Sequence, residues 1–134
     1  MKFNKSESKA VYDSSLKRNF KSLDDYSKEI RENAEFPNEL ATILLEMTHD
    51  YASVCNMLIP IEVAKMKFWL ENKNLGEKPV SDKTLEMMWM AVDDEKINGQ
   101  IQRRAEMYKK ALEKLMSSLK AVLREREVEA RNQY

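Results

Sequence analysis

The sequence contains few of the residues that form tight turns and covalent cross-links. Among its 134 residues there are two Gly, three Pro and one Cys. This scarcity leaves few places for the β-turns of a strand-rich fold, and a single cysteine, Cys55, cannot form an internal disulfide. The only histidine, His49, follows Glu46 at Glu-x-x-His spacing, but a di-iron helical bundle needs a second such pair. We expect no metal site.

Other absences restrict the class of protein. No apolar run approaches the roughly 18 residues needed to cross a bilayer, and no hydrophobic signal segment follows the start of the chain. The 23 basic and 23 acidic residues cancel, so the molecule as a whole has no field that would attract nucleic acid. There is no Gly-rich phosphate loop. We therefore expect a cytoplasmic protein without membrane contact, enzyme activity or cofactor.

Two long stretches repeat an apolar residue every three or four positions, which is the spacing of an amphipathic helix. They lie between Leu40 and Phe68 and between Ile97 and Val122. Because such stripes need partner helices, we predict an all-α fold of long helices in a hairpin, which self-associates into a homo-oligomer by coiled-coil-like packing. The residues predicted to hold copies together are Leu40, Leu44, Met47, Tyr51, Leu112, Leu115 and Leu119.

Proline and glycine mark the expected limits of the first long helix. Phe36-Pro37-Asn38 suits a helix start, and Gly76 suits a left-handed cap after the helix end. Pro60 lies inside the stripe without changing its phase, which predicts a kink, with a break into two helices as the alternative.

Two further helices are expected after this one. Ser81 is a suitable N-cap for a short helix that ends near Val92. Asp93-Asp94-Glu95 then offers a cap and a negative start for the last helix, which should run to about Arg131.

We predict that the first 36 residues form a polar arm of balanced charge. Residues 37–134 are predicted to form the helical domain, which contains the stripes for oligomerisation and the basic residues that are candidates for DNA binding. Within the arm we expect a disordered start followed by a short helix that docks on a partner, with a frayed arm as the alternative. The apolar residues at helical spacing are Tyr12, Leu16, Phe20, Leu23, Tyr26 and Ile30.

Basic residues concentrate in the last helix. Between Lys96 and Arg124 there are eight Lys or Arg and only two acids. At about 100° per residue, six of these basic residues fall roughly opposite the apolar stripe. They are Arg103, Lys109, Lys110, Lys114, Lys120 and Arg124. This face could hold a phosphate backbone through several contacts that do not depend on base sequence, or it could be an ordinary solvated surface.

A second basic candidate lies near the end of the first long helix. There, two lysines, Lys65 and Lys67, come directly before two aromatic residues, Phe68 and Trp69. Rings can stack on bases while lysines hold phosphates, so the segment could grip single-stranded nucleic acid. Alternatively, both rings belong to the core and Lys65 is a polar residue that sets helix register. We favour core positions for the rings and a surface position for Lys67.

The order of the elements resembles a known family. Ala64-Lys65-Met66-Lys67-Phe68-Trp69-Leu70, then Val80-Ser81-Asp82-Lys83 and Val92-Asp93-Asp94-Glu95-Lys96-Ile97, lie in a stretch of roughly residues 40–126 that resembles the UvsY-like recombination mediators of phages. In that family a pair of basic residues near the end of the long helix contributes to binding of single-stranded DNA, and Lys65 and Lys67 match it. Trp69-Leu70 stands where the family has a tyrosine pair.

The resemblance implies a non-catalytic mediator of DNA recombination and repair in the cytoplasm of a phage host. Members of the family form ring-like homo-oligomers and load a RecA-type recombinase onto strands coated by single-stranded DNA-binding protein. The predicted DNA-binding residues are Lys65, Lys67, Arg103, Lys110 and Lys114. The alternative is a small helical phage protein, an inhibitor or an assembly chaperone, that binds another protein through its amphipathic helices.

Overall fold

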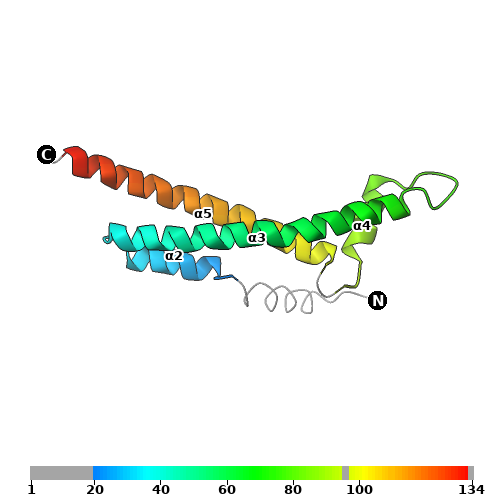
Figure 1. The fold of residues 1–134 in the computed structure, drawn as a ribbon, viewed down its shortest axis with the longest axis horizontal. Helices are drawn as coiled ribbons and strands as arrows, with labels where there is room; N and C mark the ends of the chain where they lie inside the picture. Colours follow the sequence, from blue (N-terminus) through cyan, green and yellow to red (C-terminus); the bar gives the residue numbers. More distant parts are fainter. Residues whose placement is uncertain (1–19, 95–96, 133–134) are drawn as a thin grey trace.

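A computed structural model describes residues 20–94 and 97–132, and this part of the chain contains four helices and no strand. They are α2 (Leu23–Glu32), α3 (Pro37–Asn72), α4 (Asp82–Met90) and α5 (Gly99–Asn132). Helices α3 and α5 run antiparallel and cross each other, with α2 beside the first half of α3 and α4 beside its last part (Figure 1). The predicted all-α fold with a long helical hairpin is confirmed. None of these helices has the length and apolar composition that a bilayer span requires.

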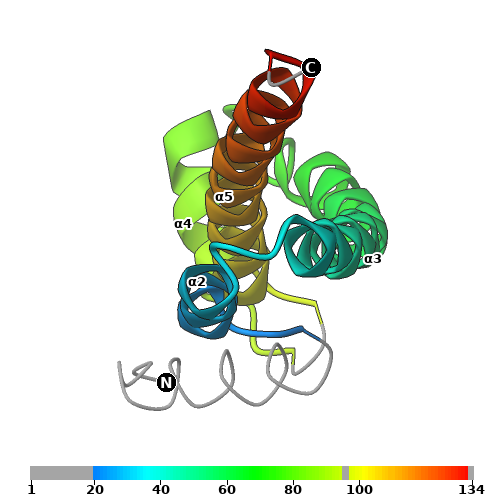
Figure 2. The same ribbon diagram turned by 90° about the vertical axis from the view of Figure 1, so that its left-hand side faces the viewer.

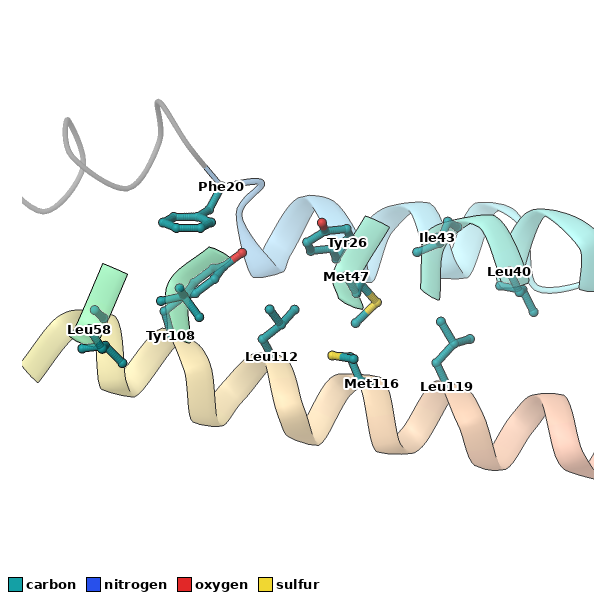
Figure 3. Close-up of a cluster of buried hydrophobic side chains, with 12 residues drawn as sticks. Phe20, Tyr26, Leu40, Ile43, Met47, Leu58, Tyr108, Leu112, Met116 and Leu119 are labelled. Carbon is teal, nitrogen blue, oxygen red and sulfur yellow. The ribbon is translucent and has the colours of Figure 1, made fainter. Parts of the chain in front are cut away.

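Most buried apolar side chains of the described residues form one cluster, to which α2, α3 and α5 all contribute. Figure 2, turned by 90° from Figure 1, shows these three helices grouped together. In Figure 3, Met47 of α3 faces Met116 of α5, while Leu40 lies near Leu119 at one end and Leu58 lies toward Tyr108 at the other. This pairing sets the register of the antiparallel helices. The cluster comprises Phe20, Tyr26, Leu40, Ile43, Met47, Val54, Leu58, Ala105, Tyr108, Leu112, Met116 and Leu119.

The residues predicted to join copies of the chain lie against one another within one chain. Four of them are buried in the cluster and three are half-buried at its edge. Contact with another copy through these residues would have to displace the chain's own packing, and oligomerisation through them stays a prediction. The buried four are Leu40, Met47, Leu112 and Leu119, and the half-buried three are Leu44, Tyr51 and Leu115.

A second, smaller cluster joins the end of α3 to α4 and to the start of α5. Its buried members are Ile61, Trp89 and Ile101. Phe68 packs on Trp89 with ring centroids 5.5 Å apart, and the Trp89 indole donates a hydrogen bond of 2.7 Å to Gln102 Oε1. Phe68 and Trp69 are both half-buried against this cluster, so the structure favours the core alternative for the two rings.

Helix α3 passes through Pro60 without a break and bends near its middle (Figure 1). The alternative of two separate helices is therefore wrong. The prediction of a left-handed cap at Gly76 is also wrong, because no described glycine has a positive φ. Backbone hydrogen bonds from the Lys73 N–H to Trp69 O and from the Val80 N–H to Lys73 O close the helix end instead.

The N-cap of α4 is Ser81, as predicted, and its hydroxyl accepts a hydrogen bond of 3.2 Å from the Thr84 N–H. The predicted start of the last helix at Asp93-Asp94-Glu95 is wrong. Helix α5 begins at Gly99, where Asn98 Oδ1 accepts a bond of 2.8 Å from the Ile101 N–H. Asp94 acts before this cap, since its carboxylate accepts from the Ile97 N–H and shapes the turn.

Gly99 begins α5 because α4 leaves no room for a side chain there. A Cβ on Gly99 would lie 2.8 Å from Met90 Sδ, 2.9 Å from Met90 Cα and 3.0 Å from Trp89 Cδ1. Gly99 is buried, and the close approach lets Trp89 reach Gln102 one turn into α5. The glycine that lowers helix propensity therefore permits the α4–α5 contact.

The start of α2 is held by a buried carboxylate on α3. Asp50 Oδ2 accepts hydrogen bonds of 2.5 Å from the Tyr26 hydroxyl and 3.2 Å from the Lys21 N–H. The Tyr108 hydroxyl of α5 donates to Lys21 O at 2.8 Å. Burial and the bond to Asp50 raise the pKa of Tyr26 above its ordinary value of 10.0. These bonds join α2, α3 and α5 at one point.

The Lys21 ammonium extends this junction to the surface. It lies 2.7 Å from Glu29 Oε1 of α2 and 2.9 Å from Glu46 Oε2 of α3, and these hydrogen bonds raise the pKa of Lys21. The helix predicted in the N-terminal arm therefore docks on its own chain. Residues before and after the predicted boundary at residue 37 contribute to the same hydrophobic core. Tyr12 and Leu16 of the predicted arm lie outside the described residues.

We expect Tyr26→Phe to lower the free energy of unfolding by about 1.5–3 kcal/mol at pH 7, because Asp50 loses a hydrogen bond to its charged form. The folded protein holds the Tyr26 proton more tightly than the unfolded chain does, so stability should fall as pH rises above about 10. Urea unfolding between pH 7 and pH 11 measures both effects. The variant should show a shallower alkaline fall than the native chain.

We expect Gly99→Ala to destabilise the protein by about 1–3 kcal/mol through overpacking against α4. Gly76→Ala is the matched control, because its Cβ would meet only Lys78 O, at 3.8 Å, in the described part of the chain. Thermal unfolding of the two variants provides the comparison. Equal stability of both variants would contradict the close approach of α4 to α5.

Candidate nucleic-acid interface

Three basic residues of α5 lie along one line on its solvent side. Arg103, Lys110 and Lys114 are exposed, and at about 100° per residue they fall within about 40° of one another, opposite the buried stripe. With a rise of about 1.5 Å per residue, the line is about 16 Å long. These three residues, which we call the α5 basic line, are part of the predicted basic face. Lys120 and Arg124 are also exposed, but Lys109 is half-buried, with its Nζ 5.9 Å from the centre of the Tyr51 ring.

Within residues 20–94 and 97–132, none of the three residues of the α5 basic line forms an ion pair with an acidic side chain. Two acids on this half of the helix, Glu106 and Glu113, are neighbours of Lys110, four residues before it and three after it, at about 40–60° around the axis. Met107, 61% exposed, falls between Arg103 and Lys110 and helps line a shallow hollow of about 330 Å³. Three cations with an apolar side chain between them can hold phosphates and cover a sugar or a base edge.

The lysine pair at the end of α3 is divided between two environments. Lys65 Nζ lies 2.6 Å from Glu86 Oε1 of α4 and 5.1 Å from the centre of the Trp69 ring. The Trp69 indole donates to Asp82 Oδ1 at 3.3 Å. Lys65 therefore faces α4 along a groove of about 670 Å³, with its charge already opposed by a carboxylate. Lys67 is exposed, as predicted, and has no ion pair within the described ranges.

The structure does not bring the five predicted DNA-binding residues into one site. Lys65 and Lys67 follow Ile61, which belongs to the same buried cluster as Ile101 near the start of α5. Lys110 and Lys114 lie on the part of α5 that pairs with residues 47–58 of α3 (Figure 3). At about 1.5 Å per residue, Lys110 and Lys114 are on the order of 20–28 Å from Lys65 and Lys67 along the bundle, whereas Arg103 is about 9–12 Å from them. The α5 basic line and the lysine pair are therefore separate candidates.

The residues considered for metal binding or catalysis do not form a site among the described residues. Glu46, the first residue of the Glu-x-x-His segment, pairs with Lys21. Cys55 is half-buried on α3. No group of three His, Cys, Asp or Glu side chains that could hold a metal ion exists among the described residues.

Comparison with protein-family models, with curated proteins and with solved structures finds no match for this chain. The resemblance to the UvsY-like mediators therefore rests on the quoted residues and the order of the helices. Arguments about function depend on the side chains described above.

If Lys65 contacts DNA phosphates, Glu86→Gln should strengthen binding of single-stranded DNA, because it removes the carboxylate that opposes the Lys65 ammonium. Fluorescence anisotropy with a labelled oligonucleotide over a salt series should show a slope steeper by about 0.7, which corresponds to one additional phosphate contact. The control is Glu71→Gln, an exposed residue without an ion pair in the described part of the chain. Equal gains in both variants would assign the effect to net charge and would exclude a specific role for Lys65.

Proposed function

We propose that this chain binds single-stranded DNA through the α5 basic line and acts, without chemistry of its own, as a recombination mediator that helps to load a RecA-type recombinase. The observation that carries the DNA-binding part is the position of Arg103, Lys110 and Lys114. They are exposed, lie opposite the core and have no acidic partner in the described residues.

The physical basis of this binding is release of counterions from the phosphate backbone. Three phosphate contacts to a single strand give a salt slope of about 2, which corresponds to weak binding by one copy. The described part of the α5 basic line contains no aromatic ring on which a base could stack, so we expect little dependence on base sequence. Several copies on one strand would add their contacts and raise the overall affinity.

The mediator role rests on the resemblance and not on the geometry. The order of helices and the position of Lys65 and Lys67 resemble those of the UvsY-like family, and this resemblance suggests the recombinase and single-stranded DNA-binding protein as partners. Exposed apolar residues on α3 offer a surface for protein contacts in addition to the α5 basic line.

The alternative is a helical interaction protein, an inhibitor or an assembly chaperone. The observation that favours it is a row of exposed aliphatic side chains on the second half of α3, which includes Ile59, Met66 and Leu70. Salt dependence separates the two functions. Phosphate binding weakens steeply as salt rises, whereas docking of apolar side chains does not.

We expect Lys110→Glu combined with Lys114→Glu to weaken binding of single-stranded DNA and to reduce the salt slope by about 1.4, since each lost contact to a single strand removes about 0.7. Lys78→Glu combined with Lys83→Glu changes the net charge equally at exposed positions away from α5 and should have a smaller effect. Electrophoretic shifts and anisotropy at several salt concentrations measure both. Circular dichroism should show unchanged helix content, because all four side chains are exposed.

Equal loss of binding in the two double variants would reduce the effect to net charge and remove the case for a site on α5. Binding of a partner protein that is insensitive to salt, together with no DNA binding by the native chain, would favour the interaction protein.

A further inference from the structure

The outer face of α3 carries a second heptad repeat. Exposed residues follow each other at alternating intervals of four and three positions from Leu45 to Leu70, with no buried residue among them. This is the strict 3.5-residue repeat of a coiled-coil seam, sustained over about 3.7 heptads, and it lies on the side opposite the core of α3. The members of this outer seam are Leu45, His49, Ala52, Asn56, Ile59, Val63, Met66 and Leu70.

The second half of the outer seam is entirely aliphatic and unusually exposed. The exposed fractions are 57% for Ile59, 46% for Val63, 66% for Met66 and 81% for Leu70. Four such side chains in consecutive heptad positions form a continuous apolar ridge, and a ridge of this kind on a folded protein marks an interaction surface. Helices α2 and α5 pack on the other side of α3, and α4 lies beside the end of the ridge, where Met66 and Leu70 line a groove with Asp82, Lys83 and Glu86. None of the ridge side chains belongs to the buried core, so a partner on the outer face could cover them without displacing it.

We propose that a second copy of this chain covers the outer seam, with the two α3 helices packed in parallel as a two-stranded coiled coil. This inference goes beyond DNA binding and does not depend on it. The interface differs from the one predicted from the sequence, because it uses the exposed side chains of α3 and leaves the buried stripes within each copy.

The charges that flank the seam fit a second copy. Glu62 and Lys67 occupy the two heptad positions on opposite flanks of the ridge, are exposed, and have no ion pair in residues 20–94 and 97–132. In a parallel pair the flank of one helix faces the opposite flank of the other, with an offset of five residues. Glu62 of each copy then meets Lys67 of the other. In an antiparallel pair like flanks face each other, and these ion pairs do not form.

Two seam residues also suit two parallel strands in register. Val63 is β-branched at the heptad position where such residues favour two strands. Asn56 occupies the equivalent position one heptad earlier, where a single Asn selects register and oligomer state at a cost in stability. A two-fold pairing of identical faces is the commonest form of self-association, and it closes after two copies.

The first measurement is mass in solution without DNA, by sedimentation velocity across a dilution series. We expect a species of twice the 15.8 kDa chain mass that dissociates on dilution. Val63→Glu combined with Leu70→Glu should yield the monomer with native helix content, because both side chains are exposed. Met107→Glu combined with Val128→Glu places the same charges on exposed apolar positions of α5 and should leave the dimer intact.

Charge exchange tests the flanks independently of the ridge. Lys67→Glu opposes Glu62 of the other copy and should raise the dimer dissociation constant several-fold. Adding Glu62→Lys to that variant should restore it, since the pairs re-form with reversed sign. If the ridge variants do not fold, this comparison still tests whether a second copy packs on the outer seam. Failure of the second change to restore association would overturn the proposed contact.

Orientation is tested by cross-linking Leu70→Cys in a Cys55→Ser background. Parallel strands in register bring the two introduced thiols within the reach of a disulfide, for which the Cα atoms must lie about 4.4–6.8 Å apart. An antiparallel pair centred on the ridge would set Leu70 opposite Ile59 and separate the thiols by roughly 16 Å. A dimer that fails to cross-link under oxidation overturns the parallel arrangement. A monomer at every concentration, a larger assembly, or a dimer unaffected by the ridge variants overturns the proposal, and none of these results bears on DNA binding by α5.

Discussion

The antiparallel contact between α3 and α5 is the constraint on which the rest of the structure depends. Each helix is too long and too amphipathic to remain alone in water, and each buries one stripe of apolar side chains against the other. Once Met47 meets Met116 and Ile61 meets Ile101, the rotation of both helices about their axes is fixed. The outward faces follow from this packing. The α5 basic line lies outside on one helix, and the outer seam lies outside on the other.

Polar groups determine how the short helices attach to this pair. Asp50 is buried on α3, and the hydroxyl of Tyr26 and the backbone of Lys21 satisfy it, so α2 can dock in only one position without leaving a buried carboxylate unpaired. At the other end, Gln102 accepts the indole hydrogen of Trp89 and orients α4. Because α4 is placed in this way, Glu86 reaches Lys65, and the lysine pair becomes one neutralised and one exposed cation.

Local patterns in the sequence were sufficient for the helices and for the exposure of the α5 basic line. The apolar repeat predicts α3 and α5, Ser81 predicts the start of α4, and the spacing of Lys110 and Lys114 predicts a solvent face, because each depends on near neighbours in the chain. Contacts between distant residues were not predictable. The α3 and α5 stripes satisfy each other within one chain, and the ion pair of Lys65 with Glu86 spans 21 residues. The start of α5 was missed for the same reason, since the room at Gly99 is set by α4.

The two hydrophobic clusters on one pair of helices differ greatly in size. Among residues 20–94 and 97–132, the larger has twelve buried side chains and the smaller has three, Ile61, Trp89 and Ile101. The end of the molecule that contains the smaller cluster therefore has less free energy opposing local opening, and its backbone amides should exchange hydrogen with solvent sooner than those around Met47 and Leu112. The region around the larger cluster should therefore open less readily than the region around the smaller one. The aliphatic ridge and the Lys65–Glu86 pair both lie at the end with the smaller cluster, so they can rearrange on contact with a partner while the region around the larger cluster stays folded.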